Sequence, residues 1–295
     1  LRMATVVIFV AVSRSPYGLY VYFCSMNRNG LIISLFAVLA LVAGSCSKYQ
    51  KLLKSTDNEQ KYEKAITYYE EKDYYRAIQL FDQLLPLFRG TERAERMAYL
   101  YANAHYEQHD YILANYYFSQ FNKNYPNNKN AEEAAFMAAY CNYLGSPAKS
   151  LDQTVTLSAI KDLQLFTNQY PKSERVAKAN ELIDELRLKL ETKALDIARL
   201  YLSMKDYKAA VINFQNLIKD YPDTRYRETA MFHIAKAYIY YAESSINEKK
   251  GERYQLSAEA ADNFLANFPD SEYAKEAQQI QKNARKQLEN LTILQ

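Results

Sequence analysis

Three short stretches with one pattern decide the fold: DYYRA at residues 73–77, DYILA at 110–114 and DYKAA at 206–210. An aromatic follows the last Ala of each stretch by four residues, at Phe81, Phe118 and Phe214. Another Ala precedes that Ala by twelve residues, at Ala65, Ala102 and Ala198. A small residue in each of two helices lets them approach closely, and the Asp-Tyr pair turns the chain between them. The pattern therefore predicts repeated antiparallel helix hairpins.

A proline at a fixed offset extends the pattern to weaker copies. Pro126 and Pro222 lie twelve residues after the Ala of their stretches, and the same offset joins Pro171 to Ala159 and Pro269 to Ser257. A proline ends a helix because it lacks an N–H and restricts the preceding residue. Small, small, aromatic and Pro at these offsets resemble the tetratricopeptide repeat, which has a period of about 34 residues. Five closing aromatics mark five repeats: Phe88, Tyr125, Tyr170, Tyr221 and Phe268.

The fold class that we predict is all-α, a tetratricopeptide-repeat superhelix of about five helix-turn-helix units plus a C-terminal capping helix. The predicted helix pairs are 58–71 with 74–87, 95–108 with 111–124, 131–144 with 154–168, 174–204 with 207–220, and 226–246 with 253–267. The extra length of the later repeats is placed in two loops, Gly145–Asp152 and Asn247–Glu252. A final helix near 271–290 is rich in Gln, Lys and Glu, as a solvated cap should be.

Composition and charge give no reason to expect nucleic-acid binding. The chain of 295 residues has only 6 Gly and 7 Pro, which favours long helices over a turn-rich β protein. Its net charge of +3 comes from the leader, because residues 1–45 contain three basic residues and no acidic ones. The remaining chain is formally neutral, so no basic footprint for nucleic acid remains.

The leader has the three parts of a secretory signal peptide. A short basic start at residues 26–30 precedes an apolar run at 31–42, and the small residues Ala43–Ser45 precede Cys46. This resembles a bacterial lipobox, in which Cys46 is lipidated and anchors the chain to a membrane, although Ala43 stands where Leu is usual. The alternative is a membrane-anchoring helix with an incidental cysteine, but the apolar run is short for a bilayer.

The sequence divides into five predicted segments. Residues 1–25 are interpreted as an over-extended start before the initiator Met26, and 26–45 as the lipoprotein signal peptide. A lipidated linker at 46–57 then leads to repeats one and two at 58–130. Repeats three to five and the capping helix fill 131–295.

Candidate chemistry is sparse. His105 and His109 lie four apart on a predicted helix, but Tyr106 stands where a metalloprotease helix needs Glu. A structural role is favoured, since a third ligand would have to come from far along the chain. Cys141 lies in an apolar run and is predicted to be a buried small hydrophobe. No phosphate loop, nucleophile elbow or Cys-x-x-Cys pair is present. We therefore expect no enzymatic activity, no cofactor and no metal.

Tyrosine is abundant, with 28 in the chain. In a tetratricopeptide array the first helix of each repeat lines the concave face. The exposed positions there form a candidate peptide-binding groove: Tyr62, Tyr69, Tyr99, Asn103 and Tyr106. Tyrosine suits an interface because it combines apolar area with a hydroxyl and few rotatable bonds. The alternative, that these rings only stabilise neighbouring helices, is equally open.

The chain resembles the BamD family, the lipoprotein subunit of the outer-membrane β-barrel assembly machinery. The resemblance rests on the leader, the five repeats and three stretches: Ser150–Thr154, Phe166–Ser173 and Asp220–Thr224. It covers nearly all of residues 46–295. The abundance of Tyr, Asn and Lys is typical of a Bacteroides-like lineage.

The resemblance implies a lipid-anchored position at the outer membrane, facing the periplasm. It implies that the N-terminal repeats help recognise unfolded outer-membrane proteins and that the C-terminal repeats contact the POTRA domains of BamA. By position, the BamA contact would fall near Arg225, Tyr226 and Arg227. Two alternatives stay open: another periplasmic tetratricopeptide lipoprotein that scaffolds envelope or cell-wall proteins, and a metal-dependent hydrolase that uses His105 and His109.

Overall fold

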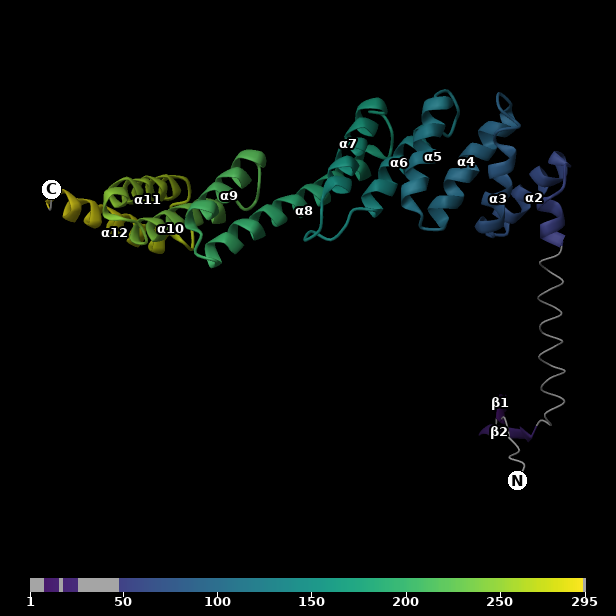
Figure 1. Ribbon diagram of the computed structural model, residues 1–295, viewed down its shortest axis with the longest axis horizontal. Coiled ribbons are helices and arrows are strands. Elements are labelled where there is room, and N and C mark those ends of the chain that lie inside the picture. The colour runs from purple at the N-terminus through teal and green to yellow at the C-terminus, as the bar shows by residue number, and fades with distance from the viewer. Residues whose placement is uncertain (1–7, 16–17, 26–47, 294–295) are drawn as a thin grey trace. The chain divides into compact units, whose positions relative to one another are not determined.

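The computed structural model describes residues 8–15, 18–25 and 48–293 (Figure 1). These residues belong to two compact units, Leu1–Ala104 and His105–Gln295. The predicted signal peptide and its lipidation site, Cys46, lie outside the described residues.

The first compact unit contains a β hairpin and the first helix hairpin. Strands β1 (Ile8–Ser15) and β2 (Gly18–Ser25) pair antiparallel and are rich in β-branched and aromatic residues, which favour extended backbone. They fall within residues 1–25, which we place before the initiator, and that start site stays a prediction. Helices α2 (Asn58–Glu70) and α3 (Tyr74–Leu84) form repeat one. Helix α4 (Glu92–Glu107) contains the boundary between the two compact units.

All regular secondary structure in the described part of the second compact unit is helical. Its helices after α4 are α5 (Tyr111–Asn124), α6 (Ala131–Leu144), α7 (Thr154–Gln169), α8 (Val176–Ser203), α9 (Tyr207–Asp220), α10 (Arg227–Glu243), α11 (Asn247–Asn267) and α12 (Ala274–Ile293). Consecutive helices pack on one another from α5 to α12. Helices α6 with α7, α8 with α9, and α10 with α11 are the hairpins of repeats three, four and five, and α12 is the cap. The predicted fold class is confirmed.

The Asp-Tyr pairs turn the chain through a specific capping arrangement. Asp110 is the N-cap of α5 and accepts a hydrogen bond from the Leu113 N–H at 3.2 Å. His109 before it has φ of 59°, and the Asp110 N–H bonds to the His105 carbonyl at 3.0 Å. A left-handed residue whose successor bonds back to a carbonyl five residues earlier satisfies the last carbonyls of the preceding helix. The same turn recurs at Asp73 and Asp206, so three copies of one sequence pattern adopt one local structure.

The repeated small and aromatic positions form the cores of the hairpins. The predicted core Ala and Phe residues are fully buried: Ala65, Ala77, Phe81, Ala102, Ala114, Phe118, Ala198, Ala210 and Phe214. Ala159 and Ser257, which only the proline offset identified, are fully buried as well. Each offset proline follows the C-cap residue of its helix, as at Tyr125 before Pro126 and Tyr221 before Pro222. The predicted register therefore holds in all five repeats.

Helix α8 belongs to two cores at once. Its first half, with Leu182 and Leu186, packs in the core of repeat three. Its second half, with Leu195 and Ala198, packs against α9 and α10. A further core joins α10, α11 and α12 around Phe232 and Phe264. A single helix of 28 residues therefore connects repeat three to repeat four.

Several predicted helix boundaries differ from the observed ones, such as the end of α10 at Glu243 rather than at residue 246, and two of the differences have a local cause. Residues Asn247–Glu252 are not a loop but the first turns of α11, because Lys and Glu favour helix and Lys249 pairs with Glu252 at 3.7 Å, three residues on. Helix α3 ends at Leu84 rather than at residue 87, because Pro86 lacks the N–H that would continue it. The predicted loop Gly145–Asp152 lies between α6 and α7 as expected.

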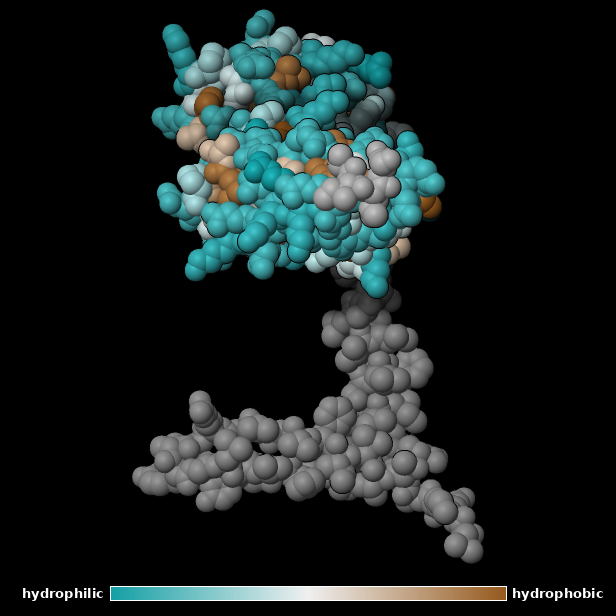
Figure 2. Space-filling model, turned by 90° about the vertical axis from the view of Figure 1, so that its left-hand side faces the viewer, coloured by the Kyte–Doolittle hydropathy of each residue, from teal (hydrophilic) through white to brown (hydrophobic). Residues whose placement is uncertain are grey.

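The capping helix presents a hydrophilic face. Figure 2 views the molecule from the side on which α10, α11 and α12 lie in Figure 1, and its described surface is mostly hydrophilic with scattered apolar residues. Ala277 and Ala284 of α12 pack in the core, whereas its Gln and Lys residues reach solvent. This matches the expected role of a terminal cap. Within the described residues, no helix is both long and apolar enough to cross a membrane.

Candidate functional site

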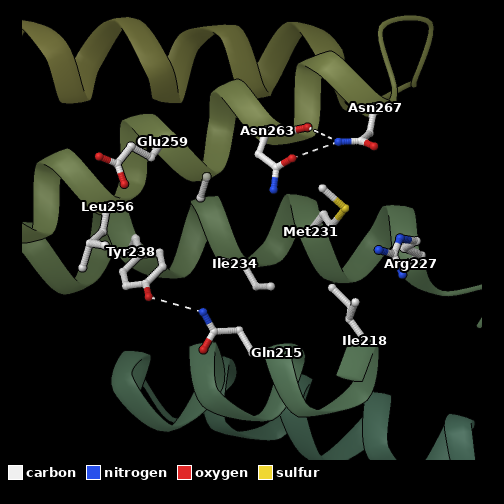
Figure 3. Close-up of a pocket in the computed structure, with 11 residues that line it drawn as sticks. Gln215, Ile218, Arg227, Met231, Ile234, Tyr238, Leu256, Glu259, Asn263 and Asn267 are labelled. Atoms are coloured by element: carbon white, nitrogen blue, oxygen red, sulfur yellow. Dashed lines mark hydrogen bonds between the residues drawn. The ribbon is translucent and has the colours of Figure 1, made fainter. Parts of the chain in front are cut away.

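A groove runs along one face of repeats four and five, between α9, α10 and α11 (Figure 3). It has two parts, with volumes of about 440 Å³ and about 360 Å³. Gln215, Tyr238 and Leu256 line both parts and join them into one feature. Every lining residue belongs to the second compact unit.

The floor of the groove is one stripe of α10. Arg227, Met231, Ile234 and Tyr238 follow one another at spacings of four, three and four residues, which places them on one helix face. The adjacent stripe, which includes Phe232, packs into the core with α11 and α12. Of the groove stripe, Arg227 is exposed and Tyr238 is half-buried, whereas Met231 and Ile234 are largely buried and border the groove with only a small exposed fraction.

Helices α9 and α11 form the walls. On α9 the lining residues are Lys208, Val211, Ile212, Gln215 and Ile218; on α11 they are Lys249, Glu252, Arg253, Leu256, Glu259, Ala260, Asn263 and Asn267. Small residues let α11 approach α10 closely, and the buried Ser257 Oγ donates a hydrogen bond to the Ala235 carbonyl at 3.1 Å. Because both walls pack on α10, their side chains converge over this stripe.

Side-chain amides lie along the rim. Asn267 Nδ2 donates to Asn263 Oδ1 at 2.9 Å and to the Asn263 main-chain oxygen at 2.8 Å. The NH₂ group of Asn263 points into the groove (Figure 3). Near the middle, Gln215 Nε2 lies 3.5 Å from the Tyr238 hydroxyl. Amides carry both donors and acceptors, which are the groups that a peptide backbone requires.

Basic residues lie at both ends of the groove. Arg227 is at one end, and Lys208, Lys249 and Arg253 are at the other. The lining has two acidic residues against these four basic ones: Glu252, which pairs with Lys249, and Glu259, which accepts a hydrogen bond from Gln255. Arg253 lies over the Tyr241 ring at 3.7 Å from its centroid. The groove therefore has an excess of positive charge, which favours an acidic ligand.

The three residues predicted for the BamA contact lie in different surroundings. Arg227 lines the groove, and its Nη1 donates to the Pro222 carbonyl at 3.1 Å. Tyr226 is half-buried, with its hydroxyl 3.0 Å from Thr192 Oγ1. Arg225 is exposed and lines a separate hollow of about 350 Å³ beside α8. Only Arg227 belongs to the groove, and the contact itself stays a prediction.

The predicted N-terminal peptide groove involves residues of both compact units. Tyr62, Tyr69, Tyr99 and Asn103 belong to the first unit and Tyr106 to the second, and all five are half-buried. Tyr62 packs near Phe88 with ring centroids 6.2 Å apart, and Tyr69 near Tyr74 at 5.5 Å. Asn103 Nδ2 donates to the Tyr99 carbonyl at 3.0 Å.

Tyr106 lies among other tyrosines. Its ring centroid is 6.1 Å from that of Tyr111 and 6.5 Å from that of Tyr140. Burial raises the pKa of the Tyr106 hydroxyl. These contacts fit a packing role, and the peptide-binding role of the five residues stays a prediction.

The histidines do not converge. His105 is buried and stacks on Tyr117 with centroids 5.2 Å apart, whereas His109 is exposed and its Nδ1 lies 2.9 Å from the Tyr111 hydroxyl. His233 stacks on Phe214 in repeats four and five. Within the described part of the chain, no group of His, Cys, Asp and Glu residues is placed to hold a metal ion.

Cys141 is a buried core residue, as predicted. Burial raises the pKa of its thiol to about 12, so the thiol stays protonated near neutral pH. A protonated, enclosed thiol is a poor nucleophile, and Cys141 acts as a packing residue of repeat three.

The sequence analysis missed most of the groove. Its α11 wall repeats at alternating spacings of four and three: Lys249, Arg253, Leu256, Ala260, Asn263 and Asn267. Five of these six residues lie in the predicted helix 253–267, and only Lys249 falls in the segment 247–252 that was interpreted as a loop. The signal was present, but the wrong boundary shortened it.

Helix hairpins with small, aromatic and proline residues at these spacings define a tetratricopeptide-repeat protein. The chain belongs to the YfiO family of outer membrane lipoproteins, which matches residues 54–256. This is the BamD-like family that the sequence motifs indicated. The match includes repeats one to four and continues into α11, so it takes in the floor of the groove and part of its α11 wall.

No curated protein matches the chain. Matches among solved structures include a tetratricopeptide-repeat protein from Bacteroides fragilis, at 14% identity and a TM-score of 0.37, covering 79% of this chain and 100% of that one. Another is a variant of kinesin-light-chain-like repeats from Podospora anserina, at 12% identity and a TM-score of 0.30, covering 72% of this chain and 96% of that one.

Proposed function

We propose that the chain is a non-enzymatic subunit of the outer-membrane β-barrel assembly machinery. It scaffolds BamA by contacting its POTRA domains and helps recognise unfolded outer-membrane proteins. Cys46 carries the lipid that anchors it to the outer membrane, and its repeats face the periplasm. Membership of the outer membrane lipoprotein family supports this function.

The groove in repeats four and five is the observation that supports the scaffold role most directly. It combines apolar side chains of α9, α10 and α11 with amides and basic residues, which together suit a protein ligand rather than a small substrate. Arg227, one of the three residues predicted for the BamA contact, lies at one end. The contact is therefore assigned to the face that α9, α10 and α11 share.

Site-specific photocrosslinking in cells tests the assignment. A photoreactive amino acid replaces Gln215, which is exposed in the middle of the groove, in the tagged full-length chain. The matched control replaces Lys161, which is exposed on α7 outside the groove. After irradiation and purification from detergent-solubilised membranes, mass spectrometry identifies the crosslinked protein.

We expect a POTRA-bearing barrel protein to be crosslinked at position 215 and not at position 161. If peptidoglycan enzymes or other envelope proteins are crosslinked instead, the chain is a scaffold of another envelope system. The proposed function would then be wrong, although the repeat architecture would stand.

A further inference from the structure

We propose that the groove binds an extended acidic segment of the partner subunit, with apolar side chains at alternate positions and an acidic residue at each end. The identity of the partner rests on the proposed function. The shape and charge of the segment rest on the groove itself. Three properties of the groove carry this assignment: its length, its amides and its charged ends.

The length of the groove suits a short peptide. The α10 stripe from Arg227 to Tyr241 spans fourteen residues, which corresponds to roughly 21 Å at 1.5 Å per residue. An extended chain rises about 3.3 Å per residue, so roughly six or seven residues cover this length.

The amides on the rim can pair with a main chain. An extended peptide that has no neighbouring strand must find partners for its N–H and C=O groups. The NH₂ group of Asn263 points into the groove, and Gln215 reaches across its middle toward Tyr238 (Figure 3). Alternate side chains of the peptide then meet accessible apolar residues of the lining, Ile212 and Leu256, while the others face solvent.

The charges at the ends select the sequence of the occupant. Arg227 and Lys208 are both exposed, and neither forms an ion pair within the described residues. They lie at opposite ends of the groove. A segment with two carboxylates about six residues apart places one near each end. Complementary charges of this kind set the register and exclude basic segments.

A binding assay with synthetic peptides tests the proposal on the purified full-length chain in detergent. The probe is fluorescein-labelled Glu-Val-Ser-Val-Ser-Val-Glu, measured by fluorescence polarisation. The comparison peptides are Lys-Val-Ser-Val-Ser-Val-Lys and a peptide with the Glu ends retained but the order of Val and Ser scrambled. We expect the acidic alternating peptide to bind at least tenfold more tightly than either.

A charge swap supplies the decisive variant. The double substitution Lys208→Glu with Arg227→Glu alters two exposed residues, so the fold should persist, and circular dichroism checks this. We expect the acidic peptide to bind at least tenfold more weakly and the lysine-ended peptide to become the preferred ligand. Asn263→Leu should weaken binding about fivefold, the effect of one hydrogen bond.

The matched control is Lys161→Glu with Lys172→Glu, two exposed positions outside the groove. It makes the same change in net charge and should leave the peptide preference unaltered. Equal binding of the acidic and basic peptides, or an unchanged preference after the groove substitutions, would overturn the proposal. Equal binding of the scrambled peptide would overturn the extended conformation.

The crosslinking experiment and the peptide-binding assay test separate claims, so either claim can be wrong while the other stands. If the peptide preference reverses as expected but a different protein is crosslinked at position 215, the groove chemistry stands and the proposed function falls. If a POTRA-bearing protein is crosslinked but the preference does not reverse, the proposed function stands and the acidic extended ligand is wrong.

Discussion

Repeat five with its cap and the middle of α8 are held together by different forces. Around α10, α11 and α12 the core is almost entirely apolar, with Phe232 and Tyr273 stacked at a centroid distance of 4.5 Å. In α8, Leu186 is the last residue of the core of repeat three and Leu195 the first of the next core. The turns between them contain one buried apolar side chain, Leu190, which belongs to neither cluster.

Polar contacts supplement this single buried leucine in the middle of α8. Lys189 Nζ donates to Ser146 Oγ at 2.8 Å and to the Pro147 carbonyl at 3.2 Å, both in the loop between α6 and α7. From the other side, the Thr224 hydroxyl donates to Glu191 at 2.9 Å.

Burying an apolar side chain stabilises the folded state more than forming a hydrogen bond within the protein does, because that hydrogen bond replaces one with water. We therefore infer that repeat five is the more stable part of the second compact unit and that local unfolding begins at the middle of α8.

The largest expected effect comes from emptying the apolar core. Phe232→Ala removes a fully buried ring that contacts Phe264 and Tyr273. Deleting a buried Phe side chain costs about 3–5 kcal/mol, because apolar burial is lost and a cavity remains. Urea denaturation followed by circular dichroism should show this loss in the free energy of unfolding. A loss below 1 kcal/mol would mean that repeat five is loosely packed and that the contrast with α8 is wrong.

Acid should weaken the same region through His233. Burial, together with Arg199 and Lys236, lowers the pKa of His233 to about 4 from 6.5. Between pH 6.5 and 4, the unfolded state therefore binds a proton at His233 that the folded state does not bind. Stability is fully present above pH 6.5 and is lost as the pH falls toward 4, by about 3 kcal/mol at most.

Replacing His233 isolates this contribution. His233→Phe should flatten the dependence of the unfolding free energy on pH between 6.5 and 4. The exposed His109 provides the control, and His109→Asn should leave the dependence unchanged. Equal pH profiles for the native chain and His233→Phe would show that His233 does not govern the acid sensitivity.

At the loop that contacts α8, we expect the loss of the buried Gln153 to lower the free energy of unfolding more than the loss of any surface side chain. Its Nε2 donates to the Ala148 and Leu151 carbonyls at 2.9 Å each, and its Oε1 accepts from the Thr156 hydroxyl at 2.8 Å. Gln153→Ala leaves these groups without their partner, at a cost of about 2 kcal/mol. Hydrogen exchange should accelerate in residues 145–156 and in the middle of α8, with repeat five unaffected. A uniform acceleration across the unit would contradict the separation of the two regions.

The smallest effect is expected for the surface ion pair at the same place. Lys149 and Asp196 are about half exposed, so solvent screens their attraction. Lys149→Ala should change the free energy of unfolding by about 0.5 kcal/mol or less. A double-mutant cycle with Asp196→Ala measures the coupling between them. A coupling above 1.5 kcal/mol would show that the junction depends on surface charge as well as on the hydrogen bonds of Gln153.

The helix hairpins could be predicted because their signals are local. Asp110 caps the 14-residue helix that follows it, and Pro126 stops that helix. Both effects act within one turn of helix, so the sequence carries them without knowledge of the fold. Ala159 and Ser257 show the strength of the spacing, since both were placed by the proline offset alone and both are fully buried.

The groove could not be predicted in the same way. Its residues come from three helices, and Gln215, Tyr238 and Leu256 are neighbours only because α9 and α11 both pack on α10. The same holds for the three residues predicted to contact BamA. Arg225 precedes the start of α10 and Arg227 begins it, and the two side chains line different hollows. Consecutive residues at a helix start point in different directions, so adjacency in the sequence is a poor guide to a shared surface.

The sequence by itself determined the class of fold, the register of five repeats and the family, because caps, small residues and prolines act over a few residues. The tertiary structure decided which faces stay open. Tyr238 and Ile239 are adjacent in the sequence, yet Tyr238 lines the groove and is half-buried, whereas Ile239 is buried in the core of α10, α11 and α12. What separates them is the packing of α9, α11 and α12 around α10, a long-range arrangement that no local pattern encodes.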